Sequence, residues 1–356
     1  MMMMSRTASF FRIAGLMSLF LVVAEGLLRI YGPALLSSVV RSEDRGYQLI
    51  PNIQAARIDP ESGLLLRFET NAFGARDRHW TDRALSKPMK IAVIGNSFVE
   101  GAQLPNAFRF TDLLERKLKD MGRDVLVMNF GVGGQNIINY LDQTRYILKR
   151  FKPEVLVIGL NDTSNFMHTR QVSFYQDQRY SYTSTQQGVT YSATPLTPLE
   201  QRYRWLKSLL RQSWLVRATF EAIQAVRVNV TGYRHNAKTN ACPLPFDMQN
   251  DTSRQAFDLT ARLVADIQKL AAERLLLLQI PGDDQVRQNN GIPGCDFSLP
   301  ETRLADFAAS HDIALVQALP RLRRSQAPTH YSGGHLNQLG HKLIAAQLAT
   351  SIANRY

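Results

Sequence analysis

The chain has 356 residues, of which 45% are hydrophobic and 20% charged, and its net charge is +12. This length and composition suit one large globular domain, alone or with an appendage. No low-complexity run, fixed-period repeat or Cys/His cluster of the metal-binding type appears in it. The basic residues are spread thinly and lack a nucleic-acid-binding motif, so a surface facing anionic lipid or acidic polysaccharide explains the charge equally well.

The N-terminal segment, residues 1–31, predicts a signal anchor or a signal peptide. Arg6 and Arg12 precede an apolar stretch, residues 13–28, in which Glu25 is costly unless it lies near the membrane interface. No clear A-x-A cleavage site follows, so we favour an uncleaved inner-membrane anchor. A cleaved signal, which would make the protein secreted, and a buried or surface helix are the alternatives. The two arginines would keep the N-terminus cytoplasmic and place the rest in the periplasm or otherwise outside the cytoplasm.

Residues 32–88 read as a linker and an irregular, β-containing preamble, and an α/β pattern fills residues 89–356. The predicted strands are residues 90–94, 125–129, 154–158, 275–280 and 313–318. Helices are predicted at residues 109–121, 137–151, 253–272, 301–310 and 338–353. This alternation indicates a three-layer α/β/α fold around a five-stranded parallel, flavodoxin-like sheet.

Residues 163–252, between the third and fourth strands, are too long for a simple crossover and predict a large insertion. The first half is polar and aromatic, and the second half has helical spacing and many arginines. We expect a lid over the C-terminal edge of the sheet, and the alternative is packing against the anchor or the preamble. Cys242 and Cys295 are the only cysteines. They could pair in an oxidising compartment or stay as free thiols.

The first strand of the α/β pattern ends abruptly at Gly95-Asn96-Ser97. Such a turn presents the serine hydroxyl at the C-terminal edge of the sheet, where α/β proteins place their ligands. The second strand is followed by Gly131, Gly133 and Gly134. Their spacing fits neither a dinucleotide fingerprint nor a Walker loop, which argues against nucleotide binding.

Two further segments carry polar residues toward the same edge. The third strand ends at Asn161-Asp162, where an asparagine amide can donate to a developing negative charge, although such an Asn is more often a turn former. Near the C-terminus, His335 lies in a glycine-rich loop before a helix. His330 and His341 flank it and are treated as structural.

The four segments together resemble the SGNH (GDSL-like) hydrolase superfamily, in particular its membrane-anchored bacterial members. The four residues that name the family match Ser97, Gly131, Asn161 and His335. The resemblance implies a serine hydrolase that needs no cofactor, with Ser97 as nucleophile and His335 as base. It also implies an oxyanion hole made of the Ser97 and Gly131 N–H groups and the Asn161 amide.

The chain departs from the family at two positions. Asn96 stands where the family has Asp, and Ser332 stands where the family places the Asp that orients the histidine. The candidates to orient His335 instead are Ser332, a backbone carbonyl, and the carboxylates of Asp162, Asp283 and Asp284. The resemblance implies an esterase, and we expect an O-acylated carbohydrate or another envelope ester as substrate. An O-acyltransferase with the same Ser-His machinery and a non-catalytic glycan-binding or assembly protein are the alternatives.

Overall fold

The computed structural model describes residues 2–36, 38–42, 45–210, 213–230, 242–247, 249–287 and 292–356. It divides into two compact units. The smaller comprises Met1–Ser38 and Thr197–Ala237, and the larger comprises Val39–Leu196 and Lys238–Tyr356. Residues 211–212, 231–241 and 248 of the predicted insertion lie outside the described residues.

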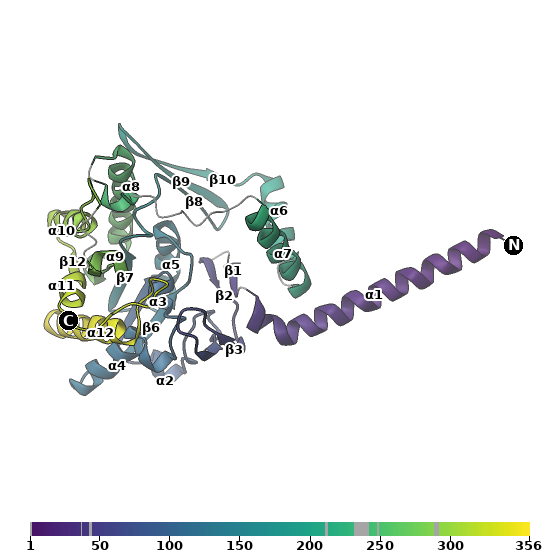
Figure 1. The fold of residues 1–356 in the computed structure, drawn as a ribbon, viewed down its shortest axis with the longest axis horizontal. Coiled ribbons are helices and arrows are strands. Elements are labelled where there is room, and N and C mark those ends of the chain that lie inside the picture. The colour runs from purple at the N-terminus through teal and green to yellow at the C-terminus, as the bar shows by residue number, and fades with distance from the viewer. Residues whose placement is uncertain are drawn as a thin grey trace. The chain divides into compact units, whose positions relative to one another are not determined.

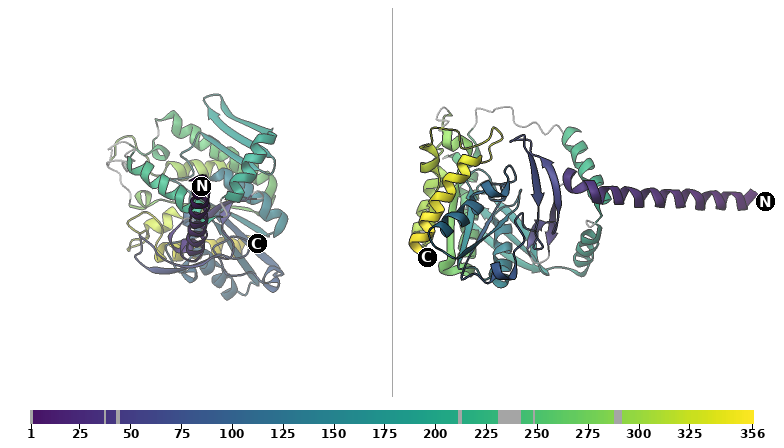
Figure 2. Two further views of the ribbon diagram at one scale, coloured as in Figure 1. Left: turned by 90° about the vertical axis from the view of Figure 1, so that its right-hand side faces the viewer. Right: turned by 90° about the horizontal axis from the view of Figure 1, so that it is seen from below.

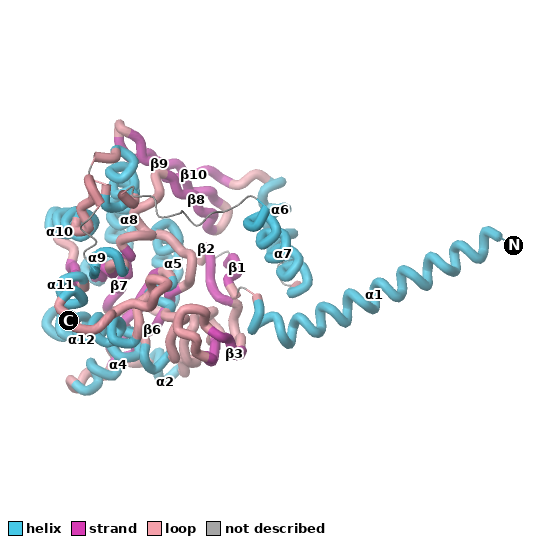
Figure 3. Tube along the Cα trace, in the orientation of Figure 1, coloured by secondary structure: helices cyan, strands magenta, loops and turns pink. Residues whose placement is uncertain are grey.

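The larger unit is built on the parallel sheet that the sequence predicts (Figures 1 and 3). Its five strands lie in the order β6-β5-β7-β11-β12. In chain order this is 2-1-3-4-5, the flavodoxin-like arrangement, so the predicted fold class is confirmed. The strands are β5 (Met89–Gly95), β6 (Val125–Gly131), β7 (Val155–Asn161), β11 (Leu275–Ile280) and β12 (Ala314–Gln317).

Helices cover both faces of this sheet. Successive residues of β5 point to opposite faces of the sheet. Ala92 and Ile94 pack in the core cluster on one face, and Ile91 and Val93 pack in the cluster on the other. The first cluster includes residues of α5 (Ile137–Arg150), α8 (Asp251–Ala271) and α10 (Leu299–Ser310). The second includes residues of α3 (Ser97–Glu100), α4 (Phe110–Asp120), α11 (Leu319–Arg323) and α12 (Gln338–Arg355). The short helix α9 (Asp283–Arg287) follows β11.

The preamble belongs to the same compact unit as the sheet rather than forming a linker. Its strands form two antiparallel pairs, β1 (Val39–Ser42) with β2 (Gly46–Leu49) and β3 (Gln54–Ile58) with β4 (Leu65–Glu69). After helix α2 (Asp82–Leu85) the chain enters β5. Trp80 is 2% exposed within the first core cluster, which ties the preamble to the α/β layers.

The predicted insertion is divided between the two units. Strands β8 (Arg170–Tyr175), β9 (Gln178–Thr185) and β10 (Gly188–Pro195) form an antiparallel sheet of the larger unit. This sheet is joined to the helices of the α/β fold: the Tyr182 hydroxyl donates to Asp266 at 3.1 Å, and the Ile138 N–H donates to Gln171 at 3.0 Å. Helices α6 (Pro198–Leu210) and α7 (Trp214–Val230) belong to the smaller unit. A single lid therefore does not describe these residues.

The smaller unit contains the N-terminal helix α1 (Met2–Leu35) (Figure 2). Within it, Phe11–Pro33 has a mean hydropathy of 2.0 and is long and apolar enough to cross a membrane. By length and composition this segment fits a membrane anchor or a signal sequence. Glu25, the costly residue of the apolar stretch, accepts hydrogen bonds from residues at the start of α7, among them Leu215 N at 2.9 Å.

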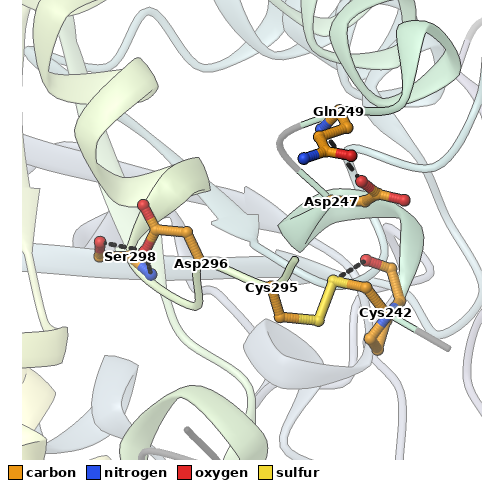
Figure 4. Close-up of a disulfide and its surroundings, with 7 residues drawn as sticks. Cys242, Asp247, Gln249, Cys295, Asp296 and Ser298 are labelled. Carbon is orange, nitrogen blue, oxygen red and sulfur yellow. Dashed lines mark hydrogen bonds between the residues drawn. A yellow bond between two sulfur atoms is a disulfide. The ribbon is translucent and has the colours of Figure 1, made fainter. Parts of the chain in front are cut away.

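A disulfide joins Cys242 and Cys295 (Figure 4), so the pairing considered from the sequence is present. It closes a sequence separation of 53 residues. The backbone continues the connection, because the Asp296 N–H donates to the Phe246 carbonyl at 2.9 Å. The disulfide therefore holds the segment before α8 against the segment before α10.

Candidate active site

Ser97 is presented by the turn between β5 and α3. The Asn96 side chain caps α3 by accepting a hydrogen bond from Phe98 N at 3.1 Å, and it donates to Ser164 Oγ at 2.7 Å. A side chain on Gly95 would overlap Val99, so a glycine is required for this close strand-to-helix turn. Asn96 thus performs a turn-forming role in the place of the family's Asp.

His335 reaches Ser97 from the loop that precedes α12. Its Nε2 lies 2.8 Å from Ser97 Oγ. The loop is fixed on both sides: Tyr331 N donates to the His335 carbonyl at 2.8 Å, and the Asn337 side chain caps α12. From the sequence, only the family resemblance related Ser97 to His335. In the structure, the two side chains are within hydrogen-bond distance.

The two neighbouring histidines are bonded elsewhere. His330 is buried with its Nε2 3.3 Å from the Pro281 carbonyl, and burial lowers its pKa. His341 accepts a hydrogen bond from Phe110 N at 3.1 Å. Burial, followed by the positive charges of Arg109 and Arg76, lowers the pKa of His341 to about 3. Both rings therefore serve as neutral packing groups.

Glu61 occupies the other side of the His335 ring. Its Oε1 lies 2.5 Å from His335 Nδ1, and its Oε2 accepts a hydrogen bond from His335 N at 3.3 Å. With Nδ1–H donating to the carboxylate, Nε2 is left to accept the Ser97 hydroxyl proton. A carboxylate, an imidazole and a hydroxyl thus form one continuous chain of hydrogen bonds.

The turn between β3 and β4 positions Glu61. Asp59 organises this turn, since its Oδ1 accepts from Glu61 N at 3.1 Å and from Ser62 N at 2.8 Å. Gly63 completes it with a φ of +68°, which favours glycine. The turn is therefore a built structure with a fixed direction for the Glu61 backbone.

The approach of this turn to the His335 loop depends on a second glycine. A side chain on Gly333 would overlap the Glu61 side chain, including its carboxyl carbon. Gly333 thus leaves space for the carboxylate beside the imidazole. The sequence signal for this arrangement is an acidic residue in a Pro/Gly turn, at residues 59–63, which we did not single out because nothing in the sequence relates it to His335.

Two of the candidate side chains for orienting His335 lie elsewhere. Ser332 is exposed, and the His335 Nδ1 position is occupied by Glu61. Asp162 is buried beneath the sheet edge, where Gln279 and Gln285 donate to its Oδ2. Its burial raises the pKa of Asp162 to about 7. Neither candidate is therefore the group beside the imidazole: the carboxylate at His335 Nδ1 is that of Glu61, from the preamble.

Gly131 is also engaged differently from the prediction. Its N–H donates to the Asn129 side chain at 2.8 Å, and a side chain here would overlap the backbone of Glu100. The glycine is thus required for packing between β6 and α3, and its N–H is not available to an oxyanion. The neighbouring Gly133 borders Ser97, because a Cβ built on it would lie 3.8 Å from Ser97 Cβ.

Two groups near this glycine turn remain relevant to charge stabilisation. Gly133 N donates to the buried Glu100 carboxylate at 2.6 Å, and burial raises the pKa of Glu100. Gly134, with a φ of +75°, follows directly, and its N–H donates to no acceptor in the described part of the chain. Gly134 is therefore the better backbone candidate in this turn.

Asn161 lies fully buried at the end of β7. One of its amide hydrogens is directed at the Ile280 carbonyl, 3.2 Å away, and its Oδ1 accepts from Thr163 and Ser164. Ser164 also accepts from Asn96. Asn161 is thus linked through Ser164 to the turn that carries Ser97, and one amide hydrogen is not used by Ile280.

A polar cavity of about 370 Å³ adjoins the site at the glycine turn. Gly133, which borders Ser97, is part of its wall. Gln135 also lines it, is 6% exposed, and has an Oε1 with no hydrogen-bond partner among the described residues. The remaining lining residues are Val39, Tyr47, Gly134, Asn136, Ile138, Asn139 and Val172. Within the described ranges, no group of three or more His, Cys, Asp or Glu side chains is arranged to hold a metal.

Comparison with known proteins gives similarity in solved structures alone. No family model and no curated sequence matches the chain. Among the solved structures, TesA is 14% identical and matches 75% of this chain and 100% of its own, with a TM-score of 0.41. A lipase/acylhydrolase from Enterococcus faecalis is also 14% identical, covering 75% of this chain and 96% of its own, with a TM-score of 0.40.

A third match carries the motif in its description. It is a G-D-S-L lipolytic protein from Veillonella parvula. This protein is 11% identical and covers 75% of our chain and 100% of its own, with a TM-score of 0.39. At these values, similarity to any of the three does not by itself assign a family or an activity to the chain.

Proposed function

We propose that this protein is an SGNH-type serine hydrolase that cleaves an ester through an acyl-serine intermediate. The observation that carries the proposal is the hydrogen-bond chain from Glu61 through His335 to Ser97. This constellation of acid, base and nucleophile is recognised by its geometry and roles rather than by sequence order.

The reaction begins when Ser97 Oγ attacks the ester carbonyl and its proton passes to His335 Nε2. The resulting imidazolium is stabilised by the Glu61 carboxylate, which also fixes the ring orientation. His335 then gives the proton to the leaving alcohol as the carbon–oxygen bond breaks. A water molecule attacks the acyl-serine in the second half of the reaction, with His335 again acting as base.

The developing oxyanion requires preorganised donors. We assign the Ser97 N–H, the Gly134 N–H and the second amide hydrogen of Asn161 to this role. Gly134 replaces Gly131 in the assignment because the Gly131 N–H already donates to Asn129. The buried network around Asn161 and Ser164 supports a fixed orientation of the amide.

The substrate class that the site favours is an O-acylated carbohydrate or a similar hydroxyl-rich envelope component. The support is the polar cavity beside Gly133, whose buried Gln135 Oε1 can accept a hydrogen bond from a hydroxyl group. The Cys242–Cys295 disulfide supports an oxidising, extracytoplasmic compartment. Helix α1 supports attachment to the inner membrane with the catalytic unit in the periplasm, or export if α1 is cleaved.

An O-acyltransferase is the second candidate, because the same cavity would position a carbohydrate hydroxyl as acceptor in place of water. The non-catalytic alternative loses its main argument. It rested on the two departures from the family pattern, Ser332 and Asn96, and Glu61 now lies with a carboxylate at the imidazole.

The test uses the full-length protein in detergent, a fluorophosphonate probe and p-nitrophenyl esters of different chain lengths. We expect labelling and turnover in the wild type and neither in Ser97→Ala. Ser310→Ala is a matched control, because Ser310 Oγ lies 3.0 Å from His311 Nδ1 in an exposed pair of the same chemistry. That variant should keep full activity.

Labelling that persists in Ser97→Ala, or its absence from the wild type, would count against a serine hydrolase. Adding a glycan acceptor distinguishes the two enzyme candidates. Acyl transfer to the glycan at the expense of free acid would favour the transferase, and an unchanged yield of free acid would favour the hydrolase.

A further inference from the structure

Helix α6 of the smaller unit exposes a continuous apolar stripe. Leu199, Tyr203, Leu206 and Leu210 are 77%, 62%, 46% and 46% exposed. Their spacing of four, three and four residues places them on one face of the helix. Large side chains gathered on one exposed face mark a surface that contacts another apolar phase or partner.

Helix α7 also exposes large apolar side chains. Phe220 and Ile223, which lie three residues apart, are 57% and 59% exposed. Trp205 on α6 is 63% exposed as well. Helices α6 and α7 therefore both present large apolar or aromatic side chains to their surroundings.

The start of α7 is bound directly to α1. Glu25 accepts hydrogen bonds from Ser213 Oγ at 2.8 Å, from Trp214 N at 3.2 Å and from Leu215 N at 2.9 Å. The free N–H groups of a helix start are natural partners of a carboxylate. A side chain on Gly32 would crowd the Trp214 ring at 2.6 Å, so this glycine permits the close packing of α7 on α1.

This attachment fixes the depth of α7 relative to the apolar segment. Glu25 lies inside Phe11–Pro33, eight residues before its end, which corresponds to about 12 Å along a helix. If Phe11–Pro33 spans a bilayer with a hydrocarbon core of about 30 Å, the start of α7 lies roughly 10 Å below one boundary of that core, at the deep end of the range for interfacial helices. Figure 2 shows α6 and α7 crossing the axis of α1 near its C-terminal end rather than running alongside it.

The charges of this region match the headgroups of anionic lipids. Residues 197–230 contain six Lys or Arg and two Asp or Glu. Long basic side chains on such helices extend their charges toward phosphates while their stems contact apolar groups.

We propose that α6 and α7 form a second membrane-binding element, lying within the interface of an anionic bilayer with the α6 stripe facing the acyl chains. The inference requires that α1 remains in the mature chain and is independent of the chemistry at Ser97. An apolar stripe on one face and a basic composition are features of an interfacial helix. The carboxylate of Glu25 then serves as the link between the spanning and the interfacial helices.

The experiment measures the depth of α6 in the full-length protein reconstituted in nanodiscs of phosphatidylcholine and phosphatidylglycerol. Single spin labels are attached at Leu206→Cys, on the stripe, and at Gln201→Cys, about 200° round the helix from Leu199. The native cysteines are joined in a disulfide and do not compete for the label. Collisions with oxygen report the acyl-chain region, and collisions with a water-soluble nickel complex report the aqueous phase.

We expect the oxygen-to-nickel ratio at position 206 to exceed that at position 201 at least fivefold. Replacing the anionic lipid by phosphatidylcholine should lower the ratio at position 206. Equal, water-like ratios at both positions would overturn the proposal. Dipolar broadening between labels at position 206 would also overturn it, because the stripe would then face a second copy of the chain.

Discussion

The residue that changes the chemical interpretation of this chain is Glu61. The sequence places an exposed serine where the SGNH family has its catalytic Asp, which left the orientation of His335 open. Glu61 fills that role in geometry, with 2.5 Å between Oε1 and His335 Nδ1. The proposed mechanism therefore has a continuous carboxylate–imidazole–hydroxyl chain, although the carboxylate comes from a different part of the sequence than in the SGNH family.

Replacing Glu61 tests this role. In Glu61→Gln we expect kcat for ester hydrolysis to fall about 10² to 10⁴-fold, because an amide neither stabilises the imidazolium nor selects the same tautomer. KM should change little, since Glu61 is behind the imidazole as seen from Ser97. Steady-state kinetics measure both, and Glu69→Gln in the same hairpin, whose carboxylate pairs with Arg67 at 2.6 Å, is the matched control.

The Ser332→Asp variant tests whether a carboxylate at position 332 can orient His335 in place of Glu61. In the wild-type background we expect no increase in turnover, because His335 Nδ1 is already bonded to Glu61. In the Glu61→Gln background, the same change should restore activity at least tenfold if an aspartate at this position reaches the imidazole. A faster enzyme from Ser332→Asp alone would show that Glu61 does not orient His335 during catalysis.

The elements of the site are two loops that meet across the fold. The β3–β4 turn carries Glu61, and the loop before α12 carries His335. Gly333 is the contact point between them, since any side chain there would overlap the carboxyl group of Glu61. The geometry of the triad thus depends on the fit of two backbone segments as well as on three side chains.

We expect Gly333→Ala to lower catalytic activity and to change the free energy of unfolding little. The added methyl group would overlap the end of the Glu61 side chain rather than backbone, and a rotation of that side chain relieves the overlap at small cost in the free energy of unfolding. The displaced Glu61 loses its contact with His335, and we expect kcat to fall about 10 to 10²-fold. Activity and thermal unfolding are measured together, with Ser332→Ala as control. A loss of activity matched by a large fall in Tm would contradict this account.

The disulfide acts on another pair of elements. Because it closes a sequence separation of 53 residues, the loop-entropy relation gives a contribution of about 4 kcal/mol to the free energy of unfolding. Cys242→Ser with Cys295→Ser should therefore lower Tm and leave kcat near the wild-type value. Chemical unfolding of the oxidised protein and of the double variant measures the difference. Unchanged stability would show that the unfolded chain is already restricted there.

At the scale of the whole molecule, buried carboxyl groups make the stability of the fold depend on pH. Burial raises the pKa of Asp162 to about 7, from 3.8 for an ordinary Asp. Between about pH 4 and pH 7, Asp162 is therefore protonated in the folded state and ionised in the unfolded state. In this range the free energy of unfolding decreases as the pH rises.

The predicted size of this effect is on the order of 2 kcal/mol between pH 5 and pH 8. Asp162→Asn, which carries no charge at either pH, should reduce the difference. The exposed Asp306 gives the control, because Asp306→Asn should leave the pH dependence as in the wild type. Unfolding by urea at the two pH values measures all three proteins. A pH dependence that is unchanged in Asp162→Asn would assign the effect to other groups.

The hydrophobic pattern of the sequence determined the α/β fold of the larger unit. The predicted strand 275–280 coincides with β11, and the other four strands and five helices agree with the structure within a few residues. This succeeds because continuous apolar runs bounded by turns carry local information about buried parallel strands. The positions of Ser97 and Asn161 follow from the same local signal, since each lies where such a run stops.

The hydrogen bonds that these residues receive from distant segments are visible only in the tertiary structure. Glu61 and His335 are separated by 274 residues, and no periodicity or motif relates a turn in the preamble to a loop before the last helix. The use of the Gly131 N–H by Asn129 and the attachment of α7 to Glu25 are likewise contacts between distant segments. The sequence by itself determined the sheet and the place of Ser97 at its edge, because these depend on local pattern. Folding alone brings the carboxylate to His335, because that contact depends on how separate elements pack.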